Sequence, residues 1–180
     1  RVGRALDEAR GELELARAPG QQVIDALGID GLFGVVEARV NDLAFAHEHL
    51  RARSIGRAQL EQTRLALQLL MHTFVRTNEL IGAEWPEFDL DAGLWAIPAS
   101  RMKMKTEHLV PLSRQSLQII AELRQTCGGS RYLFPGRNRD RPISNNTVLF
   151  ALYRLGYKSR MTGHGFRALA STILNESGFR

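Results

Sequence analysis

The spacing of apolar residues switches from a helical period to an alternating one and back, and this limits the fold more than any other feature of the chain. Between residues 57 and 74, leucines recur at the three- and four-residue spacing of a helix with a wide apolar face. After a turn at residues 91–93, residues 94–98 read as a short strand and residues 108–112 as a returning strand. Helical spacing resumes after residue 113. The sequence therefore predicts a mainly α protein of the α+β type, with a small antiparallel β-hairpin or three-stranded sheet.

Start and stop signals predict three helices after the hairpin. Ser113 is expected to cap a helix that runs to about Thr126, where two glycines stop it. Ser144 is expected to cap a second helix that continues through Leu155. A third helix is expected to start at Thr162, because an apolar run follows that N-cap candidate and the two glycines after it.

The first 55 residues are less regular than the rest. Residues 4–17 alternate opposite charges along an amphipathic helical pattern, which ends at Pro19 and Gly20. Glycines interrupt the helical signal over residues 21–53. We therefore predict an N-terminal helical segment, residues 1–55, and a main domain, residues 56–180.

The composition, with 44% hydrophobic and 24% charged residues, is that of a globular protein with a core. No apolar run reaches the roughly 18 residues of a membrane span, and no signal-peptide pattern opens the chain. The single Cys127 has no partner for an internal disulfide, which suits a reducing cytosol. These observations favour a cytoplasmic protein without a membrane partner or a metal site.

Charge is distributed unevenly along the chain, which carries a net +5. Residues 101–180 hold 14 Lys and Arg against 4 Asp and Glu, whereas residues 1–100 hold 10 against 15. A basic half of this kind points to a polyanion partner, most simply nucleic acid. Candidate DNA-contacting residues are Lys105 at the hairpin, Arg137, Arg139 and Arg141 in a basic loop, and Lys158 and Arg160 before the last helix.

Two groups of cations stand in settings that suit a phosphate. His164 and Arg167 lie three residues apart at a predicted helix start, where the helix dipole also favours negative charge. Arg76 lies at a predicted helix junction, and Glu79, three residues later, can hold the guanidinium while leaving donors for a ligand. The alternative for this pair is an ordinary surface ion pair. Lys103 lies near the tip of the predicted hairpin.

Four motifs in a fixed order resemble the catalytic domain of tyrosine recombinases of the phage and genomic-island integrase type. They are Phe-Val-Arg76-Thr-Asn-Glu79-Leu, a hairpin lysine before His108-Leu-Val-Pro-Leu-Ser, Tyr132-Leu-Phe-Pro-Gly, and Gly163-His-Gly-Phe-Arg-Ala-Leu-Ala-Ser-Thr. The resemblance covers about residues 60–180. It implies a tyrosine-recombinase catalytic fold and site-specific DNA recombination or integration by an enzyme of a mobile genetic element. In that chemistry a tyrosine attacks a DNA phosphodiester, which gives a 3′-phosphotyrosyl bond and a free 5′-hydroxyl without a metal or nucleotide cofactor.

The resemblance also implies roles for individual residues. Arg76 and Arg167 would clamp the non-bridging oxygens, and Glu79 would orient Arg76. Lys103 would protonate the departing 5′-oxygen, with Lys105 as the alternative, and His164 would donate a hydrogen bond or assist proton transfer. The partner would be the double-stranded DNA of an attachment site, on which the complete protein would self-associate.

The chain departs from the family pattern at its C-terminal end. The family places a second His or Trp, and then the nucleophilic tyrosine, beyond the His-x-x-Arg motif, whereas Tyr132, Tyr153 and Tyr157 all precede that motif here. We therefore expect a catalytic domain that is incomplete at its C-terminus, with the phosphate clamp and without the nucleophile. Residues 1–55 would be a remnant of the arm- or core-binding region. The alternatives are a non-catalytic DNA-binding remnant or regulator of an integrase, and a basic helical RNA-binding or scaffold protein.

Overall fold

A central helix, α3 (Arg57–Thr73), organises the part of the chain that the structure, a computed structural model, describes, residues 56–176. The predicted N-terminal segment, residues 1–55, and the last four residues lie outside the described residues. After α3 the elements follow in this order: α4 (Thr77–Ile81), the 3-10 turn Trp85–Glu87, β1 (Phe88–Asp89), β2 (Leu94–Ile97), the 3-10 turn Ala99–Arg101, β3 (His108–Pro111), α5 (Arg114–Cys127), α6 (Asn145–Leu152), the π-helical turn Tyr153–Tyr157 and α7 (Gly165–Glu176).

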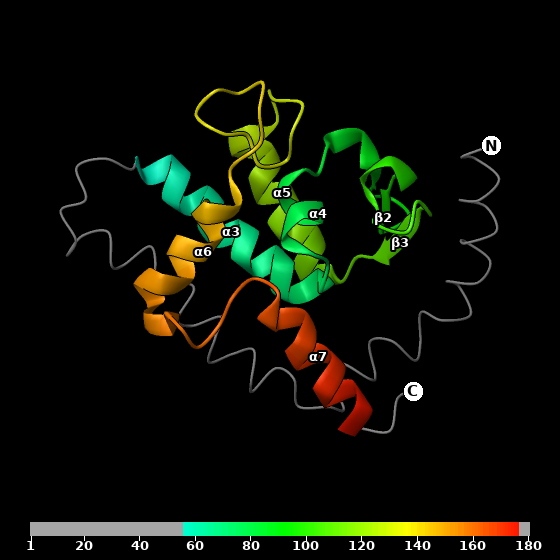
Figure 1. Cartoon of the computed structure of the whole chain (residues 1–180). Coiled ribbons are helices and arrows are strands. Elements are labelled where there is room, and N and C mark those ends of the chain that lie inside the picture. Colours follow the sequence, from blue (N-terminus) through cyan, green and yellow to red (C-terminus); the bar gives the residue numbers. More distant parts are fainter. Residues whose placement is uncertain (1–55, 177–180) are drawn as a thin grey trace. The chain divides into compact units, whose positions relative to one another are not determined.

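Helix α3 is buried nearly all round because its neighbours pack on several sides. It contacts α4, α5 and α6, and Figure 1 shows it running between α5 and α6. Burial of its side chains supplies much of the hydrophobic stabilisation of this domain. Its fully buried residues are Leu65, Ala66, Leu67, Leu69, Leu70 and Met71.

The three-stranded antiparallel sheet that the change of period predicts is present, in the order β1-β2-β3. Trp95 pairs with Phe88 on one side and with Val110 on the other, and the rings of Trp95 and Phe88 stack with centroids 5.1 Å apart. The β1–β2 turn uses Gly93 at φ 66°, a conformation that favours glycine. The mainly α fold with a small sheet is therefore as predicted.

Of the three helix starts predicted from capping residues, two lie where they were predicted, although only one of these has the capping hydrogen bond, and the third needs correction. Ser113 does cap α5, because its side chain accepts the Ser116 N–H at 3.1 Å. Ser144 precedes α6, but its hydroxyl lies 3.4 Å from Thr147 Oγ1 and accepts no backbone N–H. Thr162 is not the N-cap of α7, which begins three residues later at Gly165.

The helix predicted to continue through Leu155 ends earlier, at Leu152. A π-helical turn follows, and it contains Gly156 at φ 85°. A left-handed residue ends an α-helix, so the chain turns away before the segment that leads to α7. None of the helices within residues 56–176 is long and apolar enough to cross a membrane.

Candidate phosphate-binding site

The junction between α3 and α4 positions the Arg76 side chain, and a glutamate of α4 holds its guanidinium in place. Phe74 adopts a left-handed conformation, φ 51°, which ends α3, and Arg76 is then the extended N-cap of α4. The Arg76 backbone N–H donates to Glu79 Oε2 at 2.8 Å, and Arg76 Nη1 donates to Glu79 Oε1 at 2.6 Å. The predicted pairing of Arg76 with Glu79 is therefore present, with Arg76 as the N-cap residue of α4.

The two partners differ in burial, and this difference leaves Arg76 available to a ligand. The Glu79 side chain is 4% exposed, whereas the Arg76 side chain is 40% exposed. Of the guanidinium nitrogens, Nη1 is committed to Glu79; a guanidinium has five N–H donors in total. The buried Glu79 carboxylate thus holds the guanidinium in one orientation, and the outer edge of the guanidinium faces solvent.

The start of α7 brings two more of the predicted site residues to the same junction. Gly163 is buried against α4 so closely that a methyl group at this position would overlap Thr77 Oγ1. The next residue, His164, is exposed, and its carbonyl accepts the Ala168 N–H at 3.3 Å. Arg167, one turn into the helix, donates from Nη1 to the Phe74 carbonyl at 3.4 Å. The close glycine contact therefore explains why the start of α7 lies at the end of α3.

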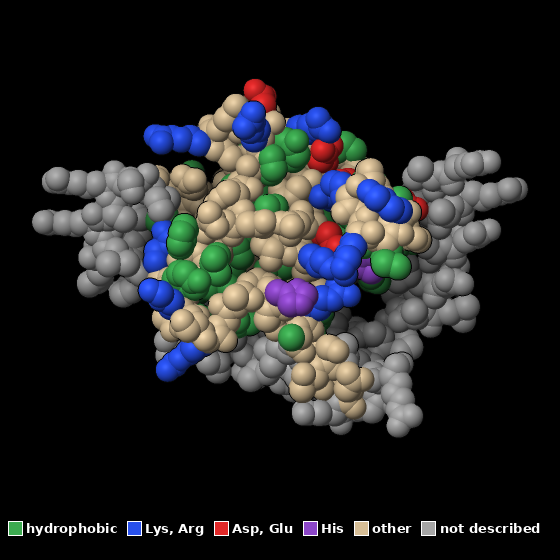
Figure 2. Space-filling model, viewed as in Figure 1, with side chains coloured by type: hydrophobic (Ala, Val, Ile, Leu, Met, Phe, Trp, Pro, Cys, Tyr) green, Lys and Arg blue, Asp and Glu red, His purple; other side chains and the backbone are tan. Residues whose placement is uncertain are grey.

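A pocket of about 340 Å³ lies where these segments meet. Figure 2 shows a histidine beside a group of Lys and Arg side chains on this face of the molecule, next to an acidic side chain. Cationic and amide donors together suit an oxyanion such as a phosphodiester. The pocket is lined by Arg76, Thr77, Asn78, Asn145, Asn146, Val148, Leu149, Thr162, Gly163 and His164.

Arg167 is not among the residues that line the pocket, and neither are the two hairpin lysines. Lys103 and Lys105 are exposed on the loop between β2 and β3, where Lys105 has φ 54°, and neither lines the pocket. The chain leaves the sheet at Ile97 and passes through the 3-10 turn that ends at Arg101, whose Nη1 donates to the Glu79 carbonyl at 3.0 Å. The hairpin is thus anchored to α4, and convergence of Lys103 on the pocket stays a prediction.

The basic loop is set apart from the pocket. Arg137, Arg139 and Arg141 are exposed, and none of them lines the pocket. The loop closes through the Gly136 N–H to the Arg141 carbonyl at 2.7 Å, and the Ser130 hydroxyl holds it beyond the end of α5 by donating to the Arg139 carbonyl at 3.2 Å. In Figure 1 it is the yellow loop at the top, whereas α7 lies at the bottom.

Two further predicted cations and the tyrosines also lie outside the pocket lining. Lys158 and Arg160 are exposed on the segment that leads into α7. Tyr132, Tyr153 and Tyr157, the chain's three tyrosines, are all described, and none of them lines the pocket. Within residues 56–176 no group of three His, Cys, Asp or Glu residues is arranged to hold a metal ion.

Sequence reasoning missed the polar amides of the pocket. Asn78 follows Arg76 by two residues, and Asn145 begins α6, so 67 positions separate them. The available signal was the polar run Ser144-Asn145-Asn146-Thr147 at a predicted helix start, which suggested capping alone.

The fold is that of a class of protein with known structures. The XerA recombinase superposes with a TM-score of 0.57 at 14% identity, covering 79% of this chain and 50% of that one. A lambda integrase dimer bound to a COC′ core site gives a TM-score of 0.53 at 17% identity, again over 79% and 50%. At these identities the likeness concerns the fold, and it confirms the predicted recombinase-like fold.

The chain belongs to the phage integrase family, whose model matches residues 42–180. It is 46% identical over 131 residues to the integrase of Enterobacteria phage P4 and 42% identical over 126 residues to the prophage integrase IntZ of Escherichia coli. These matches cover 64% and 70% of this chain, but 30% and 31% of the relatives. The chain thus spans less than a third of their length, and the predicted family is confirmed.

Proposed function

We propose that this chain carries the phosphate-binding part of an integrase active site, which serves site-specific DNA cleavage and rejoining through a 3′-phosphotyrosine. One observation supports this most directly: Arg76, held by the buried Glu79, shares a pocket with His164, while Arg167 contacts the same helix junction. The partner in this proposal is the double-stranded DNA of an attachment site, and self-association on DNA belongs to the complete protein.

In this proposal the arginines act on charge that develops at phosphorus. Attack on a phosphodiester places negative charge on the two non-bridging oxygens, and fixed guanidinium donors stabilise it without reorganising. Glu79 is a positioning residue, because it contacts Arg76 and is itself buried away from solvent. Each charge-assisted bond is worth about 1.5–3 kcal/mol, so loss of one donor group would lower the rate by roughly one to two decades.

The remaining roles concern protons and the nucleophile. His164 would donate a hydrogen bond to the phosphate or assist proton transfer, and Lys103 would protonate the departing 5′-oxygen once DNA draws the exposed hairpin loop toward the pocket. The nucleophilic tyrosine would come from sequence outside this span, since the three tyrosines present lie away from the pocket lining. Contacts to flanking DNA would come from Lys105, Lys158 and Arg160 and, further away, from the basic loop.

The test combines duplex binding with covalent trapping. The 180-residue chain should bind duplex DNA with a strong salt dependence and should form no covalent adduct on a nicked suicide duplex. A chimaera in which the sequence that follows the matched span in phage P4 integrase is joined after Arg180 should form the adduct, and Arg167→Gln should abolish it. A chimaera that binds the duplex without ever forming an adduct would favour the regulator alternative. Absence of duplex binding by the 180-residue chain would refute the proposal, whereas an adduct trapped with that chain would refute the assignment of the nucleophile.

A further inference from the structure

Two asparagines join α4 to α6 at the wall of the pocket. Asn145 Nδ2, at the start of α6, donates to Oδ1 of Asn78, in α4. Both residues are exposed, and both line the same pocket as Arg76 and His164. Both residues therefore border the space in which the proposed phosphate would lie.

The bridge uses only part of the hydrogen-bonding capacity of the two amides. An amide has two N–H donors and one oxygen acceptor. The bridge takes one donor from Asn145 and the oxygen of Asn78, so one N–H of Asn145 and both N–H groups of Asn78 have no other partner within the described residues. Three neutral donors thus belong to residues that line the same pocket as Arg76, where an acceptor-rich ligand could meet them.

We propose that the Asn78–Asn145 amide pair binds a phosphodiester of the DNA backbone directly beside the phosphate held by Arg76. This inference rests on the proposed function and adds two ligand-contacting residues to it. Phosphate oxygens only accept hydrogen bonds, and neutral amides are common donors to DNA backbones. One residue belongs to α4 and the other to α6. A phosphate that both amides contact would therefore fix these two helices relative to each other and to Arg76.

A charge change at the bridge separates phosphate binding from a purely structural role. In Asn145→Asp the new carboxylate can accept an N–H from Asn78, so the two helices stay bridged, and an acidic residue in the first turn suits α6. A structural bridge would therefore tolerate this variant. A carboxylate facing phosphate would repel it, so we expect the affinity for duplex DNA to fall at least tenfold with the melting temperature unchanged.

Alanine variants test whether the two amides act as a unit. Asn78→Ala and Asn145→Ala should each weaken duplex binding about two- to tenfold, as expected for neutral hydrogen bonds, and the double variant should lose little more than either one. The slope of log affinity against log salt should stay at the wild-type value, because neutral donors release no counterions. Gln118→Glu, an equal charge change at an exposed position on α5, is the matched control and should bind as wild type.

The probe is a short duplex, with inorganic phosphate at equal ionic strength as the second arm. The side-chain amide NMR signals of Asn78 and Asn145 should shift with the duplex and much less with inorganic phosphate; an equal shift with both would reduce the site to a general anion site and overturn the proposal. Wild-type affinity in a folded Asn145→Asp variant would overturn it and leave the Arg76 clamp standing, provided that Arg167→Gln still weakens binding. A wild-type chain that binds no duplex would refute the clamp and this inference together.

Discussion

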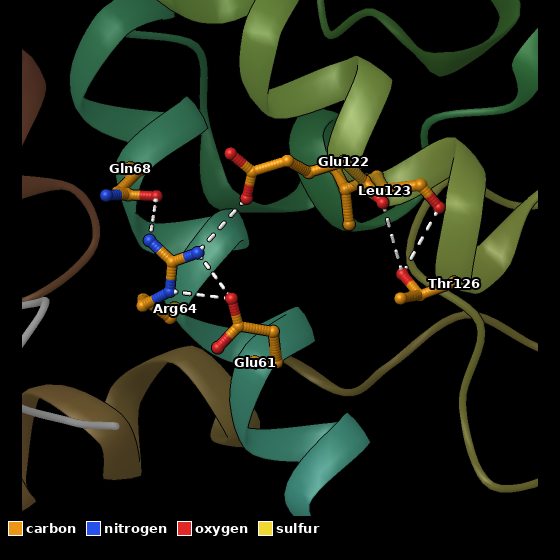
Figure 3. A network of polar contacts seen from close by, with 6 residues as sticks. All are labelled: Glu61, Arg64, Gln68, Glu122, Leu123 and Thr126. Atoms are coloured by element: carbon orange, nitrogen blue, oxygen red, sulfur yellow. Dashed lines mark hydrogen bonds and ion pairs between the residues drawn. The ribbon is translucent and has the colours of Figure 1, made fainter. Parts of the chain in front are cut away.

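Arg64 and Arg76 have the same local pattern, an arginine three residues from a glutamate, yet they are set up for different tasks. Arg64, on α3, uses Nε and Nη2 on Glu61, Nη1 on Gln68 at 2.9 Å and Nη2 on Glu122 at 3.2 Å. Figure 3 shows these contacts joining α3 to Glu122, on α5. Burial disfavours the charge on Arg64, but its bonds with the two glutamates outweigh burial and raise the pKa of the guanidinium.

Within residues 56–176, Arg76 pairs with one carboxylate, that of Glu79, and its side chain keeps an exposed edge. Its side chain is 40% exposed against 16% for Arg64, and its partner Glu79 is the buried member of the pair. Arg64 therefore ties two helices together, whereas Arg76 is held ready for a ligand. The number of guanidinium N–H groups that remain free of protein partners therefore distinguishes a ligand-binding arginine from a structural one. That number depends on neighbours in the fold that are far away in the sequence.

The largest expected effect comes from separating Arg76 from Glu79. Arg76→Gln removes the guanidinium from the proposed phosphate site, so we expect duplex affinity to fall ten- to hundredfold. The variant also leaves the buried Glu79 carboxylate without its charged partner, so the unfolding free energy should fall by up to about 3 kcal/mol. This is the lower end of the range for buried ion pairs, because the Arg76 side chain is 40% exposed. Fluorescence anisotropy and urea denaturation measure the two quantities.

The double variant Arg76→Gln with Glu79→Gln is the matched control for this effect. It removes both charges, so most of the stability should return while DNA affinity stays low. Recovery of DNA affinity along with stability would show that Arg76 acts through folding and would break the contrast with Arg64.

The opposite result is expected for Arg64. Arg64→Met keeps much of the aliphatic side chain but removes the bonds to Glu61, Gln68 and Glu122, and should lower the unfolding free energy by about 1.5–3 kcal/mol. Duplex affinity, measured by anisotropy at a temperature where the variant is folded, should not change. For Arg64→Met the slope of log affinity against log salt concentration should also equal the wild-type slope. Arg167→Gln, in contrast, should reduce that slope by about 0.9, the value for one phosphate contact. A reduced slope in the Arg64 variant would place that residue on DNA as well.

The contact that positions α7 gives a third, smaller effect. A methyl group in Gly163→Ala would overlap Thr77 Oγ1 in a buried site, and overpacking of this kind lowers stability by about 1–3 kcal/mol. Adding Thr77→Ala removes the overlapping atom and leaves the nearest contacts at 3.5 Å, so the double variant should regain the melting temperature that the single variant loses. If the second change does not restore the melting temperature, the start of α7 is not positioned by this contact.

Local patterns predicted most of the elements, because those elements depend on nearby residues. The helix over residues 57–74, the three-stranded sheet and the Ser113 cap follow from periodicity, a turn glycine and one hydroxyl, and all are present. The start of α7 was predicted at Thr162 and lies at Gly165, after a residue, Gly163, that packs closely on Thr77 of α4. Such a contact leaves no local signal.

The candidate site was predictable in its charges but not in its amides. Spacing alone gave the Arg76–Glu79 pair, because both residues lie on one turn. The Asn78–Asn145 bridge depends on the packing of α4 against α6, which no local spacing reveals. The exposed basic loop at residues 137–141 was equally visible as charge in the sequence; it does not line the pocket, and its contact with DNA stays a prediction.

Arg101 resembles Arg64 more than Arg76, because its guanidinium nitrogens bind other parts of the protein, the Glu79 carbonyl and the Glu87 carboxylate. The smallest expected effect concerns its partner Glu87. Glu87 is 10% exposed and accepts hydrogen bonds from Trp95 Nε1 at 2.9 Å and from Arg101 Nη2. Burial raises the pKa of Glu87, and the bonds from Trp95 and Arg101 offset this only in part. The folded protein therefore holds the Glu87 proton more tightly than the unfolded chain, in which a glutamate has a pKa of about 4.3.

The sign of the pH dependence follows from this difference. Between the unfolded pKa and the raised folded pKa, the folded state binds more protons, so the Glu87 contribution to unfolding free energy falls as pH rises. Urea denaturation at a series of pH values above 4 should show a shallower fall, or a steeper rise, in Glu87→Gln than in wild type. Glu107→Gln, at an exposed position on the hairpin loop, controls for the change in net charge. The opposite result would be an unfolding free energy that falls more steeply, or rises less steeply, with pH in Glu87→Gln than in wild type. It would mean that the bonds from Trp95 and Arg101 outweigh burial and lower the pKa of Glu87. Arg101 would then be an arginine that stabilises a charged partner.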